Sequence, residues 1–162
     1  MPDYKIEPLT KHNIEDLILF DKECFTENFA EDKVSILNTA RNYPKGSLLL
    51  YCGEKIVGSL FFHPYVEGQV HELNSTKTNF SGNENCMYLH SFSIHPDFRG
   101  KGLTHILFDH FNEVSLAEGY DLQALVAVQN SKRFWMRYGF KPIREINYSN
   151  APSTYMTRKT VS

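Results

Sequence analysis

The sequence predicts an α/β (α+β) fold in which strands and helices follow one another along the chain. Two apolar runs, 47–52 and 56–62, are joined by a short turn containing Gly53, which is the spacing of an antiparallel hairpin. A strand, a tight loop and a helix follow over residues 88–114. The nearly continuous apolar run 122–128 is typical of a strand buried on both faces. We therefore expect a sheet with helices packed against it.

Length and composition favour one domain without nucleic-acid or membrane partners. The chain has 162 residues, which is enough to bury a core in a single domain spanning 1–162. Its formal net charge of −2 argues against nucleic acid, since proteins that bind it carry a basic surplus. No apolar run approaches the roughly 20 residues of a membrane helix, and the polar start lacks a signal peptide's apolar region. Cys24, Cys52 and Cys86 form no Cys-x-x-Cys pair, which fits a reducing compartment, so we expect a cytoplasmic protein.

The N-terminal stretch predicts a short strand followed by a helix. Residues 4–6 alternate apolar and charged side chains, as a strand does, and Pro8 closes that strand. Thr10 is expected to cap a helix whose apolar residues recur at helical spacing. Leu19 and Phe20 are expected to widen its buried stripe.

A second helix and a long loop are predicted on either side of the hairpin. The helix runs from about Glu31 to Asn42 and ends before Pro44. Its apolar positions include Val34. From residue 63 to residue 85 the periodicity fades and polar residues gather, which indicates a long loop. A loop of this length in a compact domain is usually functional or disordered.

The C-terminal stretch predicts a short helix and a final strand. Asn130 and Ser131 are expected to cap a helix that runs through Tyr138 and ends at Gly139. Residues 140–143 lead on from it without a predicted strand. A strand at 153–159 then closes the chain.

A glycine-bearing basic loop, 99–102 (Arg-Gly-Lys-Gly), leads into the long helix. Backbone N–H groups at a helix start have no intrahelical acceptor and lie at the positive end of the dipole, so such a junction binds phosphate. A P-loop is excluded because His95 stands where its first glycine belongs. The dinucleotide fingerprint is excluded because His105 replaces its third glycine. The remaining pattern is Arg-x-x-Gly-x-x, ending at Thr104, and a plain strand-to-helix turn is the structural alternative.

This pattern resembles the acetyl-coenzyme A loop of the GNAT superfamily of N-acetyltransferases, usually Gln/Arg-x-x-Gly-x-Gly/Ala, with Thr104 as the departure. The segment 131–140, Ser-Lys-Arg-Phe-Trp-Met-Arg-Tyr-Gly-Phe, resembles the family's second motif, and Tyr155-Met156 resembles its closing strand. The predicted element order matches that fold along the whole chain. The resemblance implies a GNAT acyl-CoA N-acyltransferase fold, with a mixed, mostly antiparallel central sheet flanked by helices, and acetyl-CoA as co-substrate.

Within the superfamily the chain is similar to the arylalkylamine N-acetyltransferases. There a Leu-His-x-Leu-x-Val-His strand precedes the coenzyme loop, and a long segment separates it from a Gly-Ser-Leu strand. Residues 89–95 (Leu-His-Ser-Phe-Ser-Ile-His) and 58–60 stand in those places here. Two positions depart from the pattern, because Tyr88 replaces an earlier histidine and Trp135 replaces a tyrosine of the second motif.

The resemblance implies a coenzyme site built from the strand end, the loop and the second motif. The expected coenzyme-binding residues are Phe92, Ser93, Ile94, Arg99, Gly100, Lys101, Gly102, Leu103, Thr104, His105, Asn130, Ser131, Phe134 and Trp135. The backbone of 92–94 is expected to bond the pantetheine arm and the thioester oxygen where the strand splays from its neighbour. Lys132 and Arg133 are candidates for the 3′-phosphate, with simple solvation as the alternative.

Acetyl transfer to an amine requires a neutral amine, a polarised thioester carbonyl and a stabilised leaving thiolate. His90 is the candidate base, because imidazole titrates near neutral pH and the resemblance places it beside the acceptor. A hydrogen-bonded core histidine is the alternative. Tyr138 is the candidate acid for the thiolate, with a packing role, or protonation by water or by the amine, as alternatives. Weaker claims belong to His95 and to the exposed-looking His12, His71 and His105.

An apolar acceptor pocket is expected around Phe25, Phe29, Phe62 and Tyr65, although core packing explains Phe62 equally well. Neither His-Glu-x-x-His nor His-x-His spacing occurs, so we expect no metal site.

Three functions are compatible with these patterns. The first is acetyl transfer, by direct attack in a ternary complex, to the primary amine of a small molecule such as an arylalkylamine or a polyamine. The long segment 63–85 favours it as a lid. The second has a protein N-terminus or lysine as acceptor, and the third is an acyl-CoA-binding sensor without turnover. A monomer and a homodimer are both compatible with the sequence.

Overall fold

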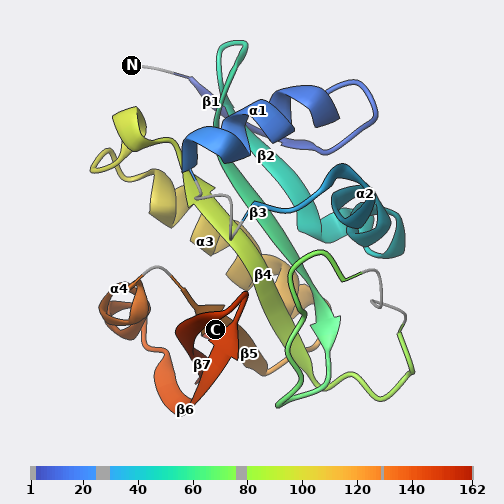
Figure 1. Cartoon of the computed structure of the whole chain (residues 1–162), viewed down its shortest axis with the longest axis vertical. Coiled ribbons are helices and arrows are strands. Elements are labelled where there is room, and N and C mark those ends of the chain that lie inside the picture. Colours follow the sequence, from blue (N-terminus) through green and yellow to red (C-terminus); the bar gives the residue numbers. More distant parts are fainter. Residues whose placement is uncertain (1–2, 25–29, 76–79, 129, 162) are drawn as a thin grey trace.

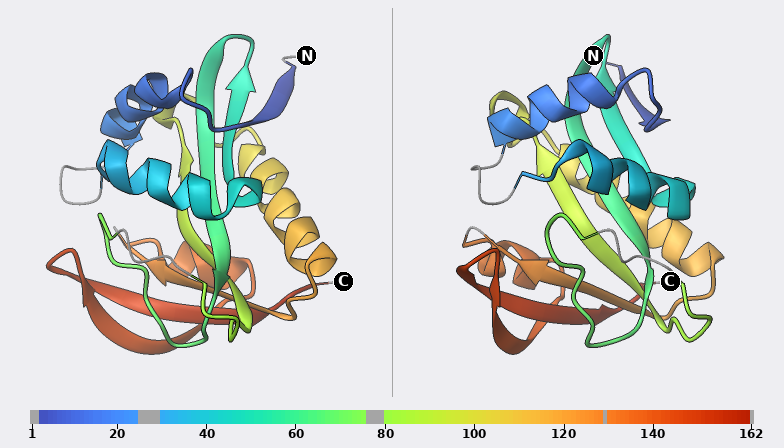
Figure 2. Two further views of the ribbon diagram at one scale, coloured as in Figure 1. Left: turned by 90° about the vertical axis from the view of Figure 1, so that its right-hand side faces the viewer. Right: turned by 45° about the vertical axis from the view of Figure 1, so that its right-hand side comes forward.

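The computed structural model describes residues 3–24, 30–75, 80–128 and 130–161, which form a seven-stranded mixed sheet flanked by helices (Figure 1). The strand order is β1-β2-β3-β4-β5-β7-β6. Neighbouring strands are antiparallel except β4 and β5, which are parallel. Helices α1 and α2 lie on one face and α3 lies on the other (Figure 2). The predicted fold class is therefore confirmed.

The elements follow the predicted order with one additional strand and two 3-10 turns. Their bounds are β1 (Tyr4–Pro8), α1 (Ile14–Cys24), α2 (Lys33–Asn42), η1 (Pro44–Gly46), β2 (Ser47–Cys52), β3 (Lys55–Tyr65), β4 (Cys86–Ile94), η2 (Pro96–Phe98), α3 (Leu103–Ala117), β5 (Leu122–Ala127), α4 (Lys132–Arg137), β6 (Lys141–Tyr148) and β7 (Ala151–Lys159). The hairpin of β2 and β3 and the strand-loop-helix from β4 to α3 are confirmed. The predicted 63–85 loop is shorter, because its first three residues belong to β3. No helix in the described part of the chain is long and apolar enough to cross a membrane.

Both N-terminal helices begin later than the sequence predicts. The Thr10 hydroxyl accepts a hydrogen bond from the backbone N–H of His12 (3.1 Å), so it closes a turn that precedes α1. Asp32 is the N-cap of α2, and its carboxylate accepts from the N–H of Ser35 (2.9 Å). Glu31 therefore lies outside the helix, in the segment that leads into it.

Three local predictions about the helices were wrong. Leu19 is 61% exposed and Val34 is 69% exposed, although both are apolar. Phe20 is buried as predicted, and Leu19 next to it lies about 100° away around the helix, outside the buried stripe. Ser131 precedes α4, but its side chain makes no capping hydrogen bond.

The strand that the sequence does not predict is β6, which pairs antiparallel with β7 at the edge of the sheet. Most of its residues are exposed, so it lacks the apolar alternation of a half-buried strand. Proline and charged residues are typical of an edge strand, where they discourage pairing with another chain. In β6 they are Pro142, Lys141, Arg144 and Glu145.

The core has a layer on each face of the sheet. On the α3 face, Phe62 packs edge-to-face against Phe111 (5.1 Å between ring centroids), within a cluster that continues to Trp135 and Phe140. On the other face, the buried side chains of α1 and α2 pack against β2 and β3. Burial of these side chains supplies most of the driving force for this arrangement.

The strand β4 contains an irregularity at the centre of the sheet. Its register with β3 shifts between Phe61, opposite Ser91, and Phe62, opposite Leu89. One residue of β4, His90, therefore lies between the two pairs as a bulge. Bulges redirect side chains, and this one lets His90 and Ser91 both face the side of α1 and α2.

The strands β4 and β5 separate after a short parallel contact. Their pairing ends at Leu89 opposite Leu125, although β4 continues to Ile94 and β5 to Ala127. Figure 2 shows the part of the sheet formed by β5, β7 and β6 turning away from the part formed by β1 to β4. One edge of β4 beyond Leu89 is thus free of a neighbouring strand, which is the splay expected from the resemblance.

Candidate functional site

A cavity of about 770 Å³ lies where β4 and β5 separate. One half is lined by the loop before α3 and by α4, through residues such as Gly102 and Tyr138. The other half is lined by α1, by the segment before α2 and by the bulge of β4, through Asp21, Glu31 and His90. We call these the loop half and the acidic half. Because the lining comes from both faces of the sheet, the cavity passes between the separated strands.

The loop half has the backbone geometry of an anion site. Gly100 (φ 77°) and Gly102 (φ 81°) adopt left-handed conformations, which side-chain-bearing residues rarely adopt. A Cβ at either position would meet open space rather than protein. Gly102 is also the N-cap of α3 and offers no side chain to its free amides. The amides of the first turn are therefore accessible to a phosphate.

Arg99 lies beside this loop but turns toward β4. Its Nε donates a hydrogen bond to the carbonyl oxygen of Ile94 (3.3 Å). The Sγ of Cys24 approaches the same oxygen at 3.8 Å. Arg99 therefore ties the loop to the splayed strand, and phosphate contacts fall mainly to backbone amides.

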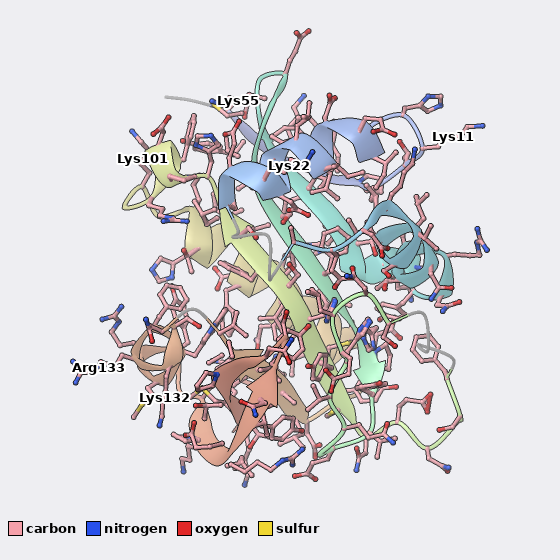
Figure 3. All side chains as sticks on the ribbon, in the orientation of Figure 1. Lys11, Lys22, Lys55, Lys101, Lys132 and Arg133 are labelled. Carbon is pink, nitrogen blue, oxygen red and sulfur yellow. The ribbon has the colours of Figure 1, made fainter. Side chains whose placement is uncertain are left out.

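Most of the expected coenzyme residues line the loop half of the cavity; Lys101 and Asn130 are the exceptions. Both are exposed, and Asn130 adopts a left-handed conformation (φ 63°) in the turn before α4. Figure 3 shows Lys101, Lys132 and Arg133 pointing outward along one side of the molecule. Lys132 pairs with Glu145 (3.2 Å), so its charge is already matched.

Trp135 and Tyr138 form an aromatic wall on α4. Trp135 is 7% exposed and packs edge-to-face against Phe92 of β4 (5.4 Å between centroids). Tyr138 is half-buried, and its ring lies 4.8 Å from that of Phe108. Burial, followed by the charge of Asp109, raises the pKa of Tyr138. Its hydroxyl therefore keeps its proton near neutral pH.

The acidic half is organised by a buried histidine–carboxyl pair. The side chain of His90 is 4% exposed, and its Nε2 contacts Oε1 of Glu31, whose side chain is 10% exposed. The other ring nitrogen of His90, Nδ1, is buried with no hydrogen-bond partner in the part of the chain that the structure describes. If Nε2 donates its proton to Glu31, Nδ1 has a free lone pair and can accept a proton.

Both carboxyl groups of the acidic half are hard to ionise. Burial, helped by the charges of Asp21 and Asp32, raises the pKa of Glu31 to about 8, against a backbone hydrogen bond from Asn74 that lowers it. Burial raises the pKa of Asp21 to about 7. Their ordinary values lie near 4, so both are poised to exchange protons around neutral pH.

Two further histidines pack against His90. The ring of His71 stacks on that of His90 with 3.6 Å between centroids, and His71 Nδ1 lies 2.9 Å from His63 Nε2. His71 is 1% exposed, so the expectation that it lies on the surface was wrong. Burial lowers the pKa of His63 and of His71 to about 4. Burial and these two neighbours also lower the pKa of His90, so the three rings are neutral near pH 7.

The predicted acceptor pocket is wrong for the two of its residues that the structure describes. Phe62 is fully buried on the α3 face and Tyr65 packs against His63 and Tyr88, so neither lines the cavity. Side chains alternate between the two faces along β3, and Phe61 rather than Phe62 lies on the cavity side. Phe25 and Phe29 lie outside the described residues.

Sequence reasoning missed the polar and covering residues of the acidic half. They are Asp21, Glu31, Thr39, Leu73 and Tyr148, all of which line the cavity. Asp21 has a sequence signal, since it falls on the apolar stripe of α1 one position after Phe20. Glu31 has none, because nothing in the sequence pairs it with a strand 59 residues away. Tyr148 was missed together with β6.

No group of three or more histidine, cysteine, aspartate or glutamate side chains in the described ranges is arranged to hold a metal ion.

This combination of a splayed central strand, a glycine loop at a helix start and an enclosed polar half defines an acyl-CoA-dependent N-acetyltransferase. The profile of the acetyltransferase (GNAT) family matches residues 12–140. The chain therefore belongs to the acetyltransferase (GNAT) family, for which acetyl-CoA is the co-substrate. No curated protein sequence matches the chain.

Solved structures show the same fold at low sequence identity. Ard1 from Thermoplasma volcanium is 18% identical with a TM-score of 0.79, over 98% of this chain and 99% of that one. Naa50 from Arabidopsis thaliana, in complex with the bisubstrate analogue CoA-Ac-MVNAL, is 13% identical with a TM-score of 0.73, over 96% and 97%. The ribosomal-protein-S18-alanine N-acetyltransferase from Escherichia coli is 14% identical with a TM-score of 0.71, over 99% and 96%.

Proposed function

We propose that the protein transfers an acetyl group from acetyl-CoA to the primary amine of a small molecule, in one ternary complex. The observation that carries the proposal is the continuity of one cavity from the loop at Gly102 to the pair of His90 and Glu31. A thioester held along β4 would present its carbonyl carbon between these two ends. The arylalkylamine-like strand that contains His90 supports the choice of acceptor class.

The loop half would hold the coenzyme. The glycines and the first amides of α3 suit the pyrophosphate, and the free edge of β4 at 92–94 suits the pantetheine arm and the thioester oxygen. Hydrogen bonds from that edge would polarise the carbonyl. Arg133, which points outward from α4, suits the 3′-phosphate.

The acidic half would prepare the amine. Glu31 orients His90 through Nε2, and Nδ1 of His90 takes the proton of the amine. The neutral nitrogen then attacks the carbonyl carbon, an N–C bond forms and the C–S bond breaks. Tyr138 gives its proton to the departing thiolate and regains one from the acylated nitrogen, which thereby becomes a neutral amide. His90 releases its proton to solvent, and the coenzyme leaves as the free thiol.

The covering segment supports a small acceptor. Leu73 lines the acidic half, and the side chain of Asn74 accepts a hydrogen bond from the N–H of Asp32 (2.7 Å). The chain after β3 is thereby tied to the start of α2, over the end of the cavity where the amine would sit. A lid of this kind suits a compact molecule better than an extended peptide.

A second candidate function is acetylation of a protein N-terminus. It is favoured by the likeness in fold to Naa50, which was solved with a bisubstrate analogue, and to the S18-alanine enzyme. Tyr148, next to the turn between β6 and β7, lines the cavity and would contact either kind of acceptor. The sensor without turnover is a third candidate, and the proton-exchanging groups around His90 argue against it.

A thiol-release assay with acetyl-CoA separates these candidates. The panel holds aryl and alkyl primary amines beside short peptides with free N-termini and with lysine. We expect the highest kcat/KM among the small amines. A peptide that exceeds every small amine would establish the second candidate, and tight coenzyme binding with no turnover would establish the sensor.

We also propose a cytoplasmic location. Cys24, Cys52 and Cys86 are free thiols, which suits a reducing compartment.

A further inference from the structure

The acidic half contains two carboxyl groups from separate segments, and one oxygen of each lacks a hydrogen-bond partner among the described residues. Asp21 of α1 is 7% exposed, and its Oδ1 has no hydrogen-bond partner among the described residues. The side chain of Glu31 is 10% exposed, and its Oε2 lacks a partner in the same way. Both residues line the cavity. Buried polar atoms are normally paired, so these two oxygens indicate a missing ligand.

In the part of the chain that the structure describes, no cation balances these carboxyl groups. Among the described lining residues, Arg99 alone carries a permanent positive charge, and its Nε is bonded to Ile94 in the loop half. The charges that act on Glu31 are the negative ones of Asp21 and Asp32. The histidines that face this half, His90 and the ring of His71 stacked on it, are neutral.

The reaction itself leaves one of the two carboxylates without a counter-charge. An acceptor amine enters as a cation but must lose its proton before it attacks. In the proposed function that proton passes to His90, beside Glu31. The positive charge then remains on the pair of His90 and Glu31, and Asp21 has none. A buried carboxylate without a counter-charge is strongly unfavourable.

We propose that Asp21 binds a second, non-reacting cationic nitrogen of the acceptor, so that the substrate is a diamine or an amine that carries a guanidinium group. The proposal rests on the proposed function and specifies its substrate class. A second cation that keeps its charge throughout the reaction would pair with Asp21 before and after the first nitrogen loses its proton. The separation between the two nitrogens would be set by the distance from Asp21 to the thioester.

The test compares matched acceptors in the thiol-release assay. Linear diamines of three to six carbons are each paired with the monoamine of the same length. We expect kcat/KM to be about 30-fold or more higher for the best diamine than for its monoamine, in the range measured for a buried charge pair. Asp21→Asn should reduce that ratio at least about tenfold. Asp16→Asn, an exposed aspartate on the same helix, should leave the ratio unchanged.

Equal kcat/KM for diamines and monoamines would overturn the proposal while leaving amine acetylation in place. An unchanged ratio in a folded Asp21→Asn protein would also overturn it. Peptides alone as substrates would instead refute the small-molecule function on which it rests.

Binding to the wild-type protein provides a test that needs no variant. With free coenzyme A present at pH 8, the best diamine should raise the melting temperature more than its monoamine at equal concentration. An equal rise would contradict the pairing at Asp21.

Discussion

His90 of β4 and Glu31 of the segment before α2 form a buried pair, with Nε2 of the ring against Oε1 of the carboxyl group. The bulge in β4 turns His90 toward Glu31, and the cap at Asp32 holds Glu31 outside the helix. The other ring nitrogen of His90, Nδ1, is buried without a hydrogen-bond partner among the described residues. A carboxylate that fixes an imidazole in this way makes its free nitrogen a proton acceptor.

The first prediction concerns the loop before α3. Gly102→Val should weaken acetyl-CoA binding more than about tenfold, because the side chain would occupy the open space in front of the amides and strain a φ of 81°. Gly119→Val is the matched control, because Gly119 follows the other end of α3 with a φ of 84° and equally open surroundings. Calorimetry measures both. Binding by Gly102→Val within about threefold of wild type, roughly 0.7 kcal/mol, would rule out the phosphate site.

The second prediction concerns the proton for the leaving thiolate. Tyr138→Phe keeps the ring that packs on Phe108 but removes the hydroxyl. We expect kcat to fall at least about tenfold with little change in melting temperature, since a positioned acid contributes about 10²-fold or more. A single-turnover measurement should show the loss in the chemical step. An unchanged rate would assign Tyr138 to packing alone.

The third prediction concerns the stability cost of Asp21. Its pKa in the folded protein, about 7, lies above the ordinary 3.8, so the folded state holds the proton over this interval and the unfolded state does not. Stability is therefore lost as pH rises from about 4 to 7. Asp21→Asn removes that loss and should raise the melting temperature at pH 8 by about 3 °C or more.

Melting temperatures at low pH test the direction of this effect. At pH 4 the gain from Asp21→Asn should be much smaller, because the pH is then barely above the ordinary pKa of 3.8 and little of the loss has accumulated. Asp16→Asn should change neither value, because Asp16 is exposed. A gain for Asp21→Asn that is equal at both pH values would contradict the raised pKa.

The sequence predicts the loop half of the site well because its signals are local. The glycines and Arg99 lie within one stretch of chain, and phosphate binding depends on the backbone geometry that they produce. The hairpin and the strand-loop-helix are local for the same reason. Lys101 and Asn130 also lie in local motifs but do not line the cavity, because which residues border it depends on the tertiary structure.

The acidic half could not be predicted because it is assembled from distant segments. The bulge at His90 arises from the pairing of β3 with β4, and a single strand does not reveal such a pairing. Alternation along β3 places Phe62 in the core and Phe61 at the cavity, and the sequence alone does not say which face of that strand borders the cavity. The burial of His71 depends on how the chain after β3 folds back. The strand β6 was not predicted because an exposed edge strand carries no apolar alternation. The single-domain extent of 1–162 stays a prediction.

The fourth prediction concerns the pH dependence of the reaction. The pKa of Glu31 is raised to about 8, so below that value it holds a proton, which it donates to His90 Nε2. His90 then carries its own proton on Nδ1 and cannot accept another. For an acceptor amine whose pKa is below 7, kcat/KM should rise about tenfold per pH unit up to about 8 and then level off. In the Glu31→Gln protein the rise of kcat/KM with pH should disappear and the plateau value should fall. An unchanged rise would assign the titration to another group.

The account depends most directly on His90. His90→Gln should lower kcat/KM for the best amine about 10²-fold or more, while the Kd for acetyl-CoA stays within about threefold and the melting temperature is nearly unchanged. His95→Gln is the matched control, because His95 pairs with Glu23 outside the cavity and should retain activity. A His90→Gln protein that is active but less stable would contradict the account, because it would make His90 a core histidine rather than the base.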